Sequence, residues 1–161
     1  MELLDVVDKE NNVIGSQPRD EVHEKGLPHR TVMFFVLDEQ GRILVTKRTE
    51  NKDFFPGYWS IVLGGHVKAG ESYEDALLSE MKEEVGTIGE YKEIGEFIKD
   101  IEEETEHVKV YSVSIDTKKI KLCTEEVEIG EFWTKEKIKI EMNQRDFLPE
   151  TYQLIEYLSK L

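Results

Sequence analysis

The segment 73–85 constrains the fold of this chain most, because it is predicted to form a helix with carboxylates on its buried side. Its apolar positions recur every four residues, at Tyr73, Leu77, Met81 and Val85. This spacing is typical of a helix that packs one face against a sheet. Ser72 is suited to cap the start of the helix, with Asp75 three positions on, and Gly86 is suited to end it.

Glutamates lie beside this apolar stripe. At about 100° per residue, Glu84 lies roughly 20° from Leu77 and Glu80 roughly 60° from it. Glu83 follows Glu80 at i+3, so the three carboxylates can converge. Like charges about 6 Å apart repel by roughly 3 kcal/mol per pair at an effective dielectric of 20, and burial adds a desolvation cost. A bound Mg²⁺ or Mn²⁺ would remove both penalties, whereas the alternative is an ordinary solvated acidic face.

The charge balance restricts the partners. The formal net charge of −14 would repel long DNA or RNA, because nucleic-acid binding depends on Lys and Arg that neutralise phosphates. A small phosphorylated ligand remains compatible with clustered carboxylates that gather divalent cations. The N-terminal residues lack a signal-peptide pattern and no stretch is apolar enough to span a membrane, so we expect a cytoplasmic protein without a membrane partner. The single cysteine, Cys123, is expected to be a half-buried structural thiol.

Apolar runs separated by turn signals predict the remaining elements. Strands are expected over 3–7, 13–15, 31–37, 43–47, 60–63, 91–99, 107–115 and 127–133, and further helices over 135–142 and 147–161. The first two pairs of strands are expected to form hairpins, and the acid run 102–104 separates the strands 91–99 and 107–115. Strands on both sides of a central helix predict an α+β fold, a mixed sheet covered by helices in one domain over 1–161.

The segment around the helix resembles the Nudix box. It contains Gly65, then Glu71 after five residues, and then, after seven more, Ser79-Glu80-Met81-Lys82-Glu83-Glu84-Val85-Gly86. Six of the seven fixed letters of the box are present, and Ser79 stands where the family has Arg. The resemblance implies a three-layer α/β/α sandwich around the mixed sheet. It also implies metal-dependent hydrolysis of a diphosphate linkage in a nucleoside diphosphate derivative or a related small molecule.

The same resemblance implies roles for individual residues. Glu80, Glu83 and Glu84 would be ligands of Mg²⁺ or Mn²⁺, together with the carbonyl of Gly64, and Glu71 would have an orienting role. The general base is left open between Glu80, Glu84 and two residues of the later acidic segment, Glu104 and Glu106. The loss of the Arg at Ser79 implies either a rearranged support of the glutamates or a non-catalytic module that binds nucleotides or metal.

Most of residues 1–135 is similar to a Nudix subgroup related to isopentenyl-diphosphate isomerase. The cues are Leu4-Asp5-Val6-Val7-Asp8, Pro28-His29-Arg30, Leu44-Val45-Thr46-Lys47-Arg48 and Phe55-Pro56-Gly57-Tyr58-Trp59. By this resemblance the diphosphate-binding residues would be Arg19, Arg48 and Lys52. A possible second metal site would comprise His23, His29, His66 and Glu106, with His107 nearby.

Three departures favour hydrolysis over isomerisation. Gly64 occupies the position of the isomerase's catalytic cysteine, and Glu80 and Glu83 replace a basic and an aromatic residue. An isomerase-like enzyme remains the alternative. The exact substrate stays open. The oligomeric state stays open as well, because no heptad or other self-association pattern is present.

Overall fold

The computed structural model describes residues 1–101 and 103–161, and its centre is a mixed sheet. The sheet runs in the order β5 (Trp59–Ser60), β4 (Ile43–Arg48), β3 (His29–Leu37), β8 (Glu104–Ser114) and β7 (Glu90–Ile101), while β6 (Leu63–His66) pairs with β3 and β9 (Val127–Trp133) pairs with β4. The β3–β8 pair is parallel and the other pairs are antiparallel. The expected α+β fold around a mixed sheet is therefore confirmed.

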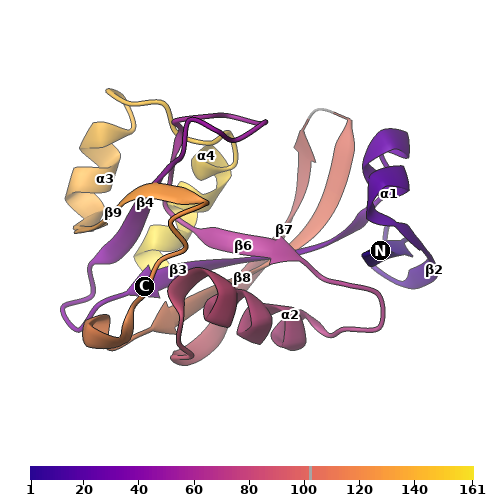
Figure 1. Ribbon diagram of the computed structural model, residues 1–161, viewed down its shortest axis with the longest axis horizontal. Coiled ribbons are helices and arrows are strands. Elements are labelled where there is room, and N and C mark those ends of the chain that lie inside the picture. The colour runs from indigo at the N-terminus through magenta and orange to yellow at the C-terminus, as the bar shows by residue number, and fades with distance from the viewer. Residues whose placement is uncertain (102) are drawn as a thin grey trace.

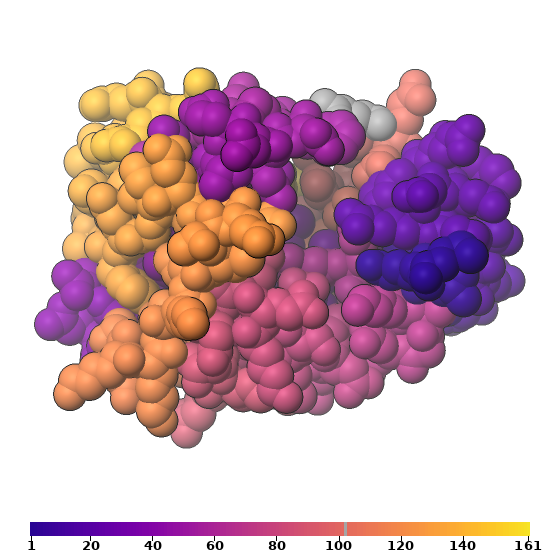
Figure 2. All heavy atoms as spheres, in the orientation of Figure 1, coloured from indigo at the N-terminus to yellow at the C-terminus, as the bar shows by residue number. Residues whose placement is uncertain are grey.

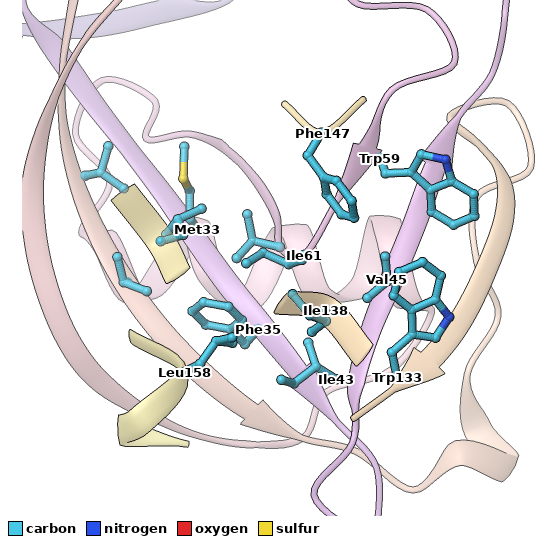
Figure 3. Close-up of a cluster of buried hydrophobic side chains, with 14 residues drawn as sticks. Met33, Phe35, Ile43, Val45, Trp59, Ile61, Trp133, Ile138, Phe147 and Leu158 are labelled. Atoms are coloured by element: carbon cyan, nitrogen blue, oxygen red, sulfur yellow. The ribbon is translucent and has the colours of Figure 1, made fainter. Parts of the chain in front are cut away.

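Helices cover both faces of this sheet (Figure 1). Side chains alternate along β3, so Val32 and Phe34 pack against α2 (Tyr73–Glu80), while Met33 and Phe35 face the opposite side. That opposite side is covered by α3 (Lys135–Glu141), α4 (Thr151–Leu154) and the 3₁₀ turn Ile155–Lys160. Figure 3 shows this second core, in which the rings of Trp59 and Trp133 lie 5.3 Å apart. The three-layer arrangement matches the expectation.

The central helix follows the predicted limits but changes its winding. The Ser72 hydroxyl accepts a hydrogen bond from the Asp75 amide at 3.0 Å, and the Asp75 carboxylate accepts one from the Ser72 amide at 3.1 Å, which completes a capping box. After Glu80 the backbone widens into a π-helical turn, Met81–Val85, which ends at Gly86 with a φ of 79°. A π turn of this kind shifts the side chains that follow relative to an α-helical projection.

The N-terminal residues form a small lobe beside the main sheet. Strands β1 (Leu3–Val7) and β2 (Val13–Pro18) pair, and α1 (Arg19–Lys25) buries Val22 against Leu4 and Val6. The helix α1 is missing from the predicted elements because it is short and buries one residue, too few for a helical period. No helix among the described residues has the length and apolar character needed to cross a membrane.

Several predicted elements need correction. Strands β3 and β4 pair at Leu37 and Ile43 alone, because the rest of β3 pairs with β6 and β8, so the predicted hairpin is reduced to its turn. The strand predicted over 60–63 is two short strands, β5 and β6. The final helix is shorter than 147–161, since α4 begins after Pro149 and continues as a 3₁₀ turn.

The β7–β8 hairpin is longer than predicted. Strand β8 begins at Glu104, earlier than predicted. The prediction missed this start because the first inward side chains of β8 are polar, so the apolar alternation typical of a strand is absent there. Residue 102 of the predicted acid run lies outside the described residues, and Glu104 belongs to the strand.

The capping box predicts the effect of one substitution. Ser72→Ala removes the acceptor for the Asp75 amide, so the free energy of unfolding should fall by about 1 kcal/mol in a urea titration. Ser16→Ala, at an exposed position of β2, is the control and should change stability by less than about 0.5 kcal/mol. Equal effects of the two substitutions would contradict the capping role.

Candidate active site

A cavity of about 430 Å³ lies beside the C-terminal half of the central helix. Besides this helix, its lining comes from Glu2 before β1, the start of α1, the end of β4 with the following loop, the stretch from Gly64 to Lys68 and the chain before β9. Figure 2 shows a hollow on this face, between the indigo N-terminal lobe and the purple and orange segments. The charged residues of the lining are Glu2, Arg19, Arg48, Lys52, Lys68, Glu80, Glu83, Glu84 and Glu126.

Glu84 is the most enclosed of the helix carboxylates. Burial, together with the charges of Glu80 and Glu126, raises its pKa to about 8, although a hydrogen bond with the Gly64 backbone opposes the rise. Its Oε2 atom is buried and has no hydrogen-bond partner among the described residues. An ionised carboxylate in this position needs a counter-charge, so the group fits a bound cation.

Glu80 lies against the glycine-rich strand. A Cβ atom at Gly65 would overlap the Glu80 carboxylate, which means that this glycine allows the side chain to approach the β6 backbone. Burial and the charge of Glu83 raise the pKa of Glu80 to about 7, and the nearby Lys68 ammonium acts in the opposite direction. Lys68 is therefore a cation close to the helix carboxylates in a chain that has Ser79 in place of Arg.

The other two predicted glutamates lie in different surroundings. Glu83 is exposed and lines the same cavity as Glu80 and Glu84. Among the described residues, the groups of imidazoles and carboxylates whose ligand atoms lie within 4.8 Å of one another do not include these three glutamates, so their convergence on one ion stays a prediction. Glu71 does not line the cavity: its Oε2 accepts a hydrogen bond from the Lys68 amide at 3.1 Å. This contact holds the turn between β6 and α2, and it matches an orienting role better than a catalytic one.

The three predicted phosphate-binding residues come together at the cavity. Arg19 reaches it from the start of α1, and Arg48 and Lys52 reach it from the end of β4 and the following loop. Arg48 donates a hydrogen bond to the Phe54 carbonyl at 3.1 Å, while its buried Nε has no partner among the described residues. Lys52 forms an ion pair with Glu126.

The predicted second metal site is also assembled in space. The rings of His23, His29 and His66 lie 5.0 to 5.4 Å apart, and one ligand atom from each falls within 4.8 Å of the others. His29, Glu104 and Glu106 form an overlapping group by the same measure. Burial, together with the charges of the neighbouring His29 and Arg19, lowers the pKa of His66 to about 3, so this ring is neutral at pH 7. His107 does not belong to the cluster, since it points to the other face of β8 and lines a separate pocket with Tyr73.

A second arm of the cavity, about 300 Å³, joins the glutamates to this cluster. Arg48, Gly64, Gly65, His66, Glu84 and Glu126 line both arms. The second arm adds Lys99 and Glu106, which form an ion pair at 3.7 Å. Lys68, Lys99 and Glu126 are cavity residues that the sequence analysis did not indicate. Lys99 and Glu126 belong to segments distant in sequence from the helix, whereas Lys68 lies in the turn before it. Cys123 lines the first arm and is half-buried, as expected.

Comparison with known proteins identifies the family. The sequence model described as "NUDIX domain" matches residues 27–151. This chain belongs to the Nudix hydrolase family. An uncharacterised Nudix hydrolase of Pseudomonas aeruginosa is 32% identical over 155 residues, which cover 96% of this chain and 91% of that protein. The predicted family is thereby confirmed.

Other relatives match over a shorter part. An isopentenyl-diphosphate Δ-isomerase of Serratia proteamaculans is 38% identical over 96 residues, 60% of this Nudix chain and 54% of the isomerase. A Nudix hydrolase of Streptomyces coelicolor is 43% identical over 88 residues, 55% of this chain and 49% of that protein. The chain thus spans about half the length of several curated relatives. The likeness to the isomerase subgroup is confirmed at the level of sequence.

Solved structures share the fold. A protein from Deinococcus radiodurans superimposes with a TM-score of 0.80 at 23% identity, and the match covers 99% of this chain and 98% of that one. The Nudix domain of a Shewanella oneidensis protein, NrtR, was crystallised with ADP ribose, and it gives a TM-score of 0.63 at 14% identity over 89% of this chain and 98% of that domain. Members of this family generally depend on a divalent metal.

Gly64 leaves no room for a side chain. A Cβ atom at this position would overlap the Val32 carbonyl of the neighbouring strand. The isomerase cysteine expected at this place therefore cannot be restored in this Nudix protein unless β3 or β6 moves.

The same overlap predicts a loss of stability on substitution. Gly64→Ala should lower the free energy of unfolding by about 2 to 3 kcal/mol in urea, because the new methyl group meets backbone atoms. Gly15→Ala is the matched control, since no heavy atom lies within 4 Å of its added Cβ, and it should stay within about 0.5 kcal/mol of the wild type. If Gly64→Ala were as mild as the control, the close packing of β6 on β3 would be wrong.

The raised pKa values predict how the metal-free protein responds to pH. In the folded state Glu80 and Glu84 have pKa values of about 7 and about 8, above the ordinary 4.5, so the folded protein binds more protons than the unfolded chain in this range. The free energy of unfolding should therefore fall as the pH rises. Below pH 6.5 the lowered pKa of His66 acts in the opposite sense, because stability is then lost as the pH falls.

Above pH 6.5 the titration of His66 no longer changes stability, so the effect of Glu80 and Glu84 can be measured alone. With EDTA present, urea unfolding should show a loss of about 1 to 2 kcal/mol between pH 6.5 and pH 8. Glu84→Gln should reduce this slope, because the titrating group is gone. Constant or rising stability of the wild type over this interval would contradict the buried position of the two carboxylates.

Proposed function

We propose that this Nudix protein hydrolyses a diphosphate linkage in a small nucleoside diphosphate derivative, with Mg²⁺ or Mn²⁺ as cofactor. The observation that supports this most directly is the buried Glu84 carboxylate, whose Oε2 has no partner among the described residues and which shares a cavity with Glu80 and Glu83. Three helix carboxylates on one wall and four basic side chains around it, Arg19, Arg48, Lys52 and Lys68, form a charge pattern suited to a cation and a diphosphate together.

The donor set fits a hard divalent cation. Glu80, Glu83 and Glu84 would hold it, with the Gly64 carbonyl as a further oxygen ligand, and oxygen-only sites favour Mg²⁺ or Mn²⁺. When bound, such a cation supplies polarisation of the diphosphate and activation of water for attack at phosphorus. Ionisation of Glu84 and Glu80, whose pKa values are raised in the metal-free protein, then becomes favourable at neutral pH.

The basic side chains bind the substrate in this proposal. Arg48 lines both arms of the cavity and has a buried Nε free of partners among the described residues, so it is placed to donate to a phosphate oxygen. Arg19 and Lys52 reach the cavity from different segments, the start of α1 and the loop after β4. Lys52 forms an ion pair with Glu126 in this structure, so it must leave Glu126 before it can bind a phosphate group of the substrate.

The proton-accepting group is assigned to the helix. Glu104 is held by His23 at 2.5 Å and Glu106 accepts a hydrogen bond from Thr31 at 3.0 Å, so both later carboxylates are already engaged. Glu80 and Glu84 line the cavity in which the cation and the diphosphate would be held. A carboxylate oxygen of Glu80 or Glu84 that is not bound to the cation is therefore proposed to take the proton of the attacking water.

The class of substrate follows from charge and from one relative. The net charge of −14 disfavours long nucleic acids, whereas a cation-assisted site accepts a small diphosphate. The structurally similar Shewanella domain bound ADP ribose, which supports a nucleoside diphosphate derivative here. A cytoplasmic location is part of this proposal.

Individual residues argue against the two alternative functions, an isomerase and a non-catalytic binding module. An isomerase needs a cysteine at position 64, where a side chain would overlap the Val32 carbonyl. A non-catalytic module would follow from the loss of the Arg at Ser79, but Lys68 supplies a cation near Glu80. Hydrolysis therefore gives a role to more of the cavity residues than either alternative does.

Glu84→Gln should lower Mg²⁺-dependent turnover by about 10² to 10⁴, because it removes one charged ligand and keeps the shape. Product release from a panel of nucleoside diphosphate derivatives, with isopentenyl diphosphate as a further substrate, provides the measurement. Glu74→Gln, an exposed glutamate on the same helix, is the control and should retain wild-type turnover. Turnover of Glu84→Gln at the wild-type level would exclude this site, and isomerised product would favour the isomerase.

A further inference from the structure

The histidine cluster brings several lone pairs into one buried space. His29 Nδ1 lies 2.9 Å from the Leu27 carbonyl oxygen, which can only accept, so this nitrogen carries the hydrogen. His23 Nδ1 lies 2.5 Å from a Glu104 oxygen and carries its hydrogen for the same reason. In the neutral rings both Nε2 atoms therefore present lone pairs, and both are buried without a partner among the described residues.

Glu106 adds negative charge to the same space. The residue is 6% exposed, and its Oε2 accepts a hydrogen bond from Thr31 at 3.0 Å. Its Oε1 lies 3.9 Å from His29 Nε2 and 3.7 Å from Lys99 Nζ, so this oxygen faces the cluster on one side and an ammonium on the other. A buried carboxylate needs such a positive partner to remain ionised.

Lys99 is placed to be a removable partner. It lies on β7 directly across from Glu106 on β8, with its side chain 20% exposed and lining the second arm of the cavity. The lysine side chain is flexible and strongly hydrated at its tip, so it can turn from Glu106 into the second arm of the cavity. The distance of 3.7 Å to Glu106 shows an ion pair without a direct hydrogen bond.

We propose that Lys99 is an internal counter-ion that competes with a divalent cation for the His23, His29, His66 and Glu106 cluster. The Lys99 ammonium and the cation both need Glu106 Oε1, so binding of the cation displaces Lys99 from this oxygen. Lys99 thereby weakens cation binding, and the cluster fills with a cation that imidazole nitrogens bind well, such as Zn²⁺ or Co²⁺, in preference to Mg²⁺.

This role can be tested separately from the proposed hydrolytic site, although Glu84 and Lys99 line the same arm of the cavity. Lys99 is not among the residues that surround Glu80 and Glu83, and the cluster is built from imidazoles, whereas the helix offers oxygen ligands. Failure of the Lys99 proposal would leave the glutamate site intact, and failure of hydrolysis would leave the cluster unaffected.

Titration with Co²⁺, followed by visible absorption, tests the proposal, because a site with imidazole ligands differs in its spectrum from an all-oxygen octahedral site. Lys99→Met should bind Co²⁺ at the imidazole-type site at least tenfold more tightly than the wild type. Lys99→Arg, which retains the charge, should stay within about threefold of the wild type. Lys109→Met is the matched control, because Lys109 pairs with Glu93 at 3.1 Å outside the cluster, and it should not change the affinity.

His29→Ala in the Lys99→Met background should abolish the imidazole-type absorption, which assigns the signal to this cluster. Far-ultraviolet circular dichroism of each variant checks that the fold is retained. Equal or weaker Co²⁺ binding by folded Lys99→Met would overturn the proposal, because Lys99 would then support the cluster instead of competing for it. A spectrum without imidazole ligands in that variant would overturn it as well.

Discussion

The burial of Glu84 beside the Gly64–His66 strand is the constraint on which the rest of this site depends. The helix must pack its apolar stripe on the sheet, and the following π turn carries Glu84 against the glycine-rich strand. Burial raises the pKa of this carboxylate to about 8, so the metal-free protein holds a group that is only stable when protonated or matched by a cation. Ionised Glu84 thus destabilises the metal-free fold, although metal binding requires the ionised form. A bound divalent cation would remove this cost.

The surrounding segments supply the complementary charge. The N-terminal lobe contributes Arg19, the loop after β4 contributes Lys52, and the turn before α2 contributes Lys68. Two of these cations act on a carboxylate: Lys52 forms an ion pair with Glu126, and the charge of Lys68 lowers the pKa of Glu80. A chain with a net charge of −14 thereby keeps a locally mixed cavity in which a diphosphate and a cation can both be bound.

The local features of this site were predictable from the sequence. The period of the apolar stripe and the Ser72 and Gly86 caps fixed the helix, and the box spacing placed Glu80, Glu83 and Glu84 on the wall of one cavity. The π turn was not predictable, since its residues also suit an α-helix. Glu71 lies outside the cavity lining because its carboxylate accepts from the Lys68 amide, a contact that spacing alone does not reveal.

Contacts between distant segments limited the prediction elsewhere. The parallel pairing of β3 with β8 sets His29 opposite Glu106, and β7 sets Lys99 opposite the same residue. These registers depend on the whole sheet, so no local pattern indicated Lys99. The same holds for Glu126, which reaches the cavity from the chain before β9.

A crystal structure of the protein grown with Mn²⁺ would show whether the helix carboxylates hold a cation, because the anomalous signal locates the ion without assumptions. We expect an anomalous peak at about 2.1 Å from Glu84 Oε2, the distance typical of small hard cations, with Glu80 and Glu83 turned toward it. A map without a peak near these side chains, with Glu84 still buried and unpaired or turned outward to solvent, would contradict it.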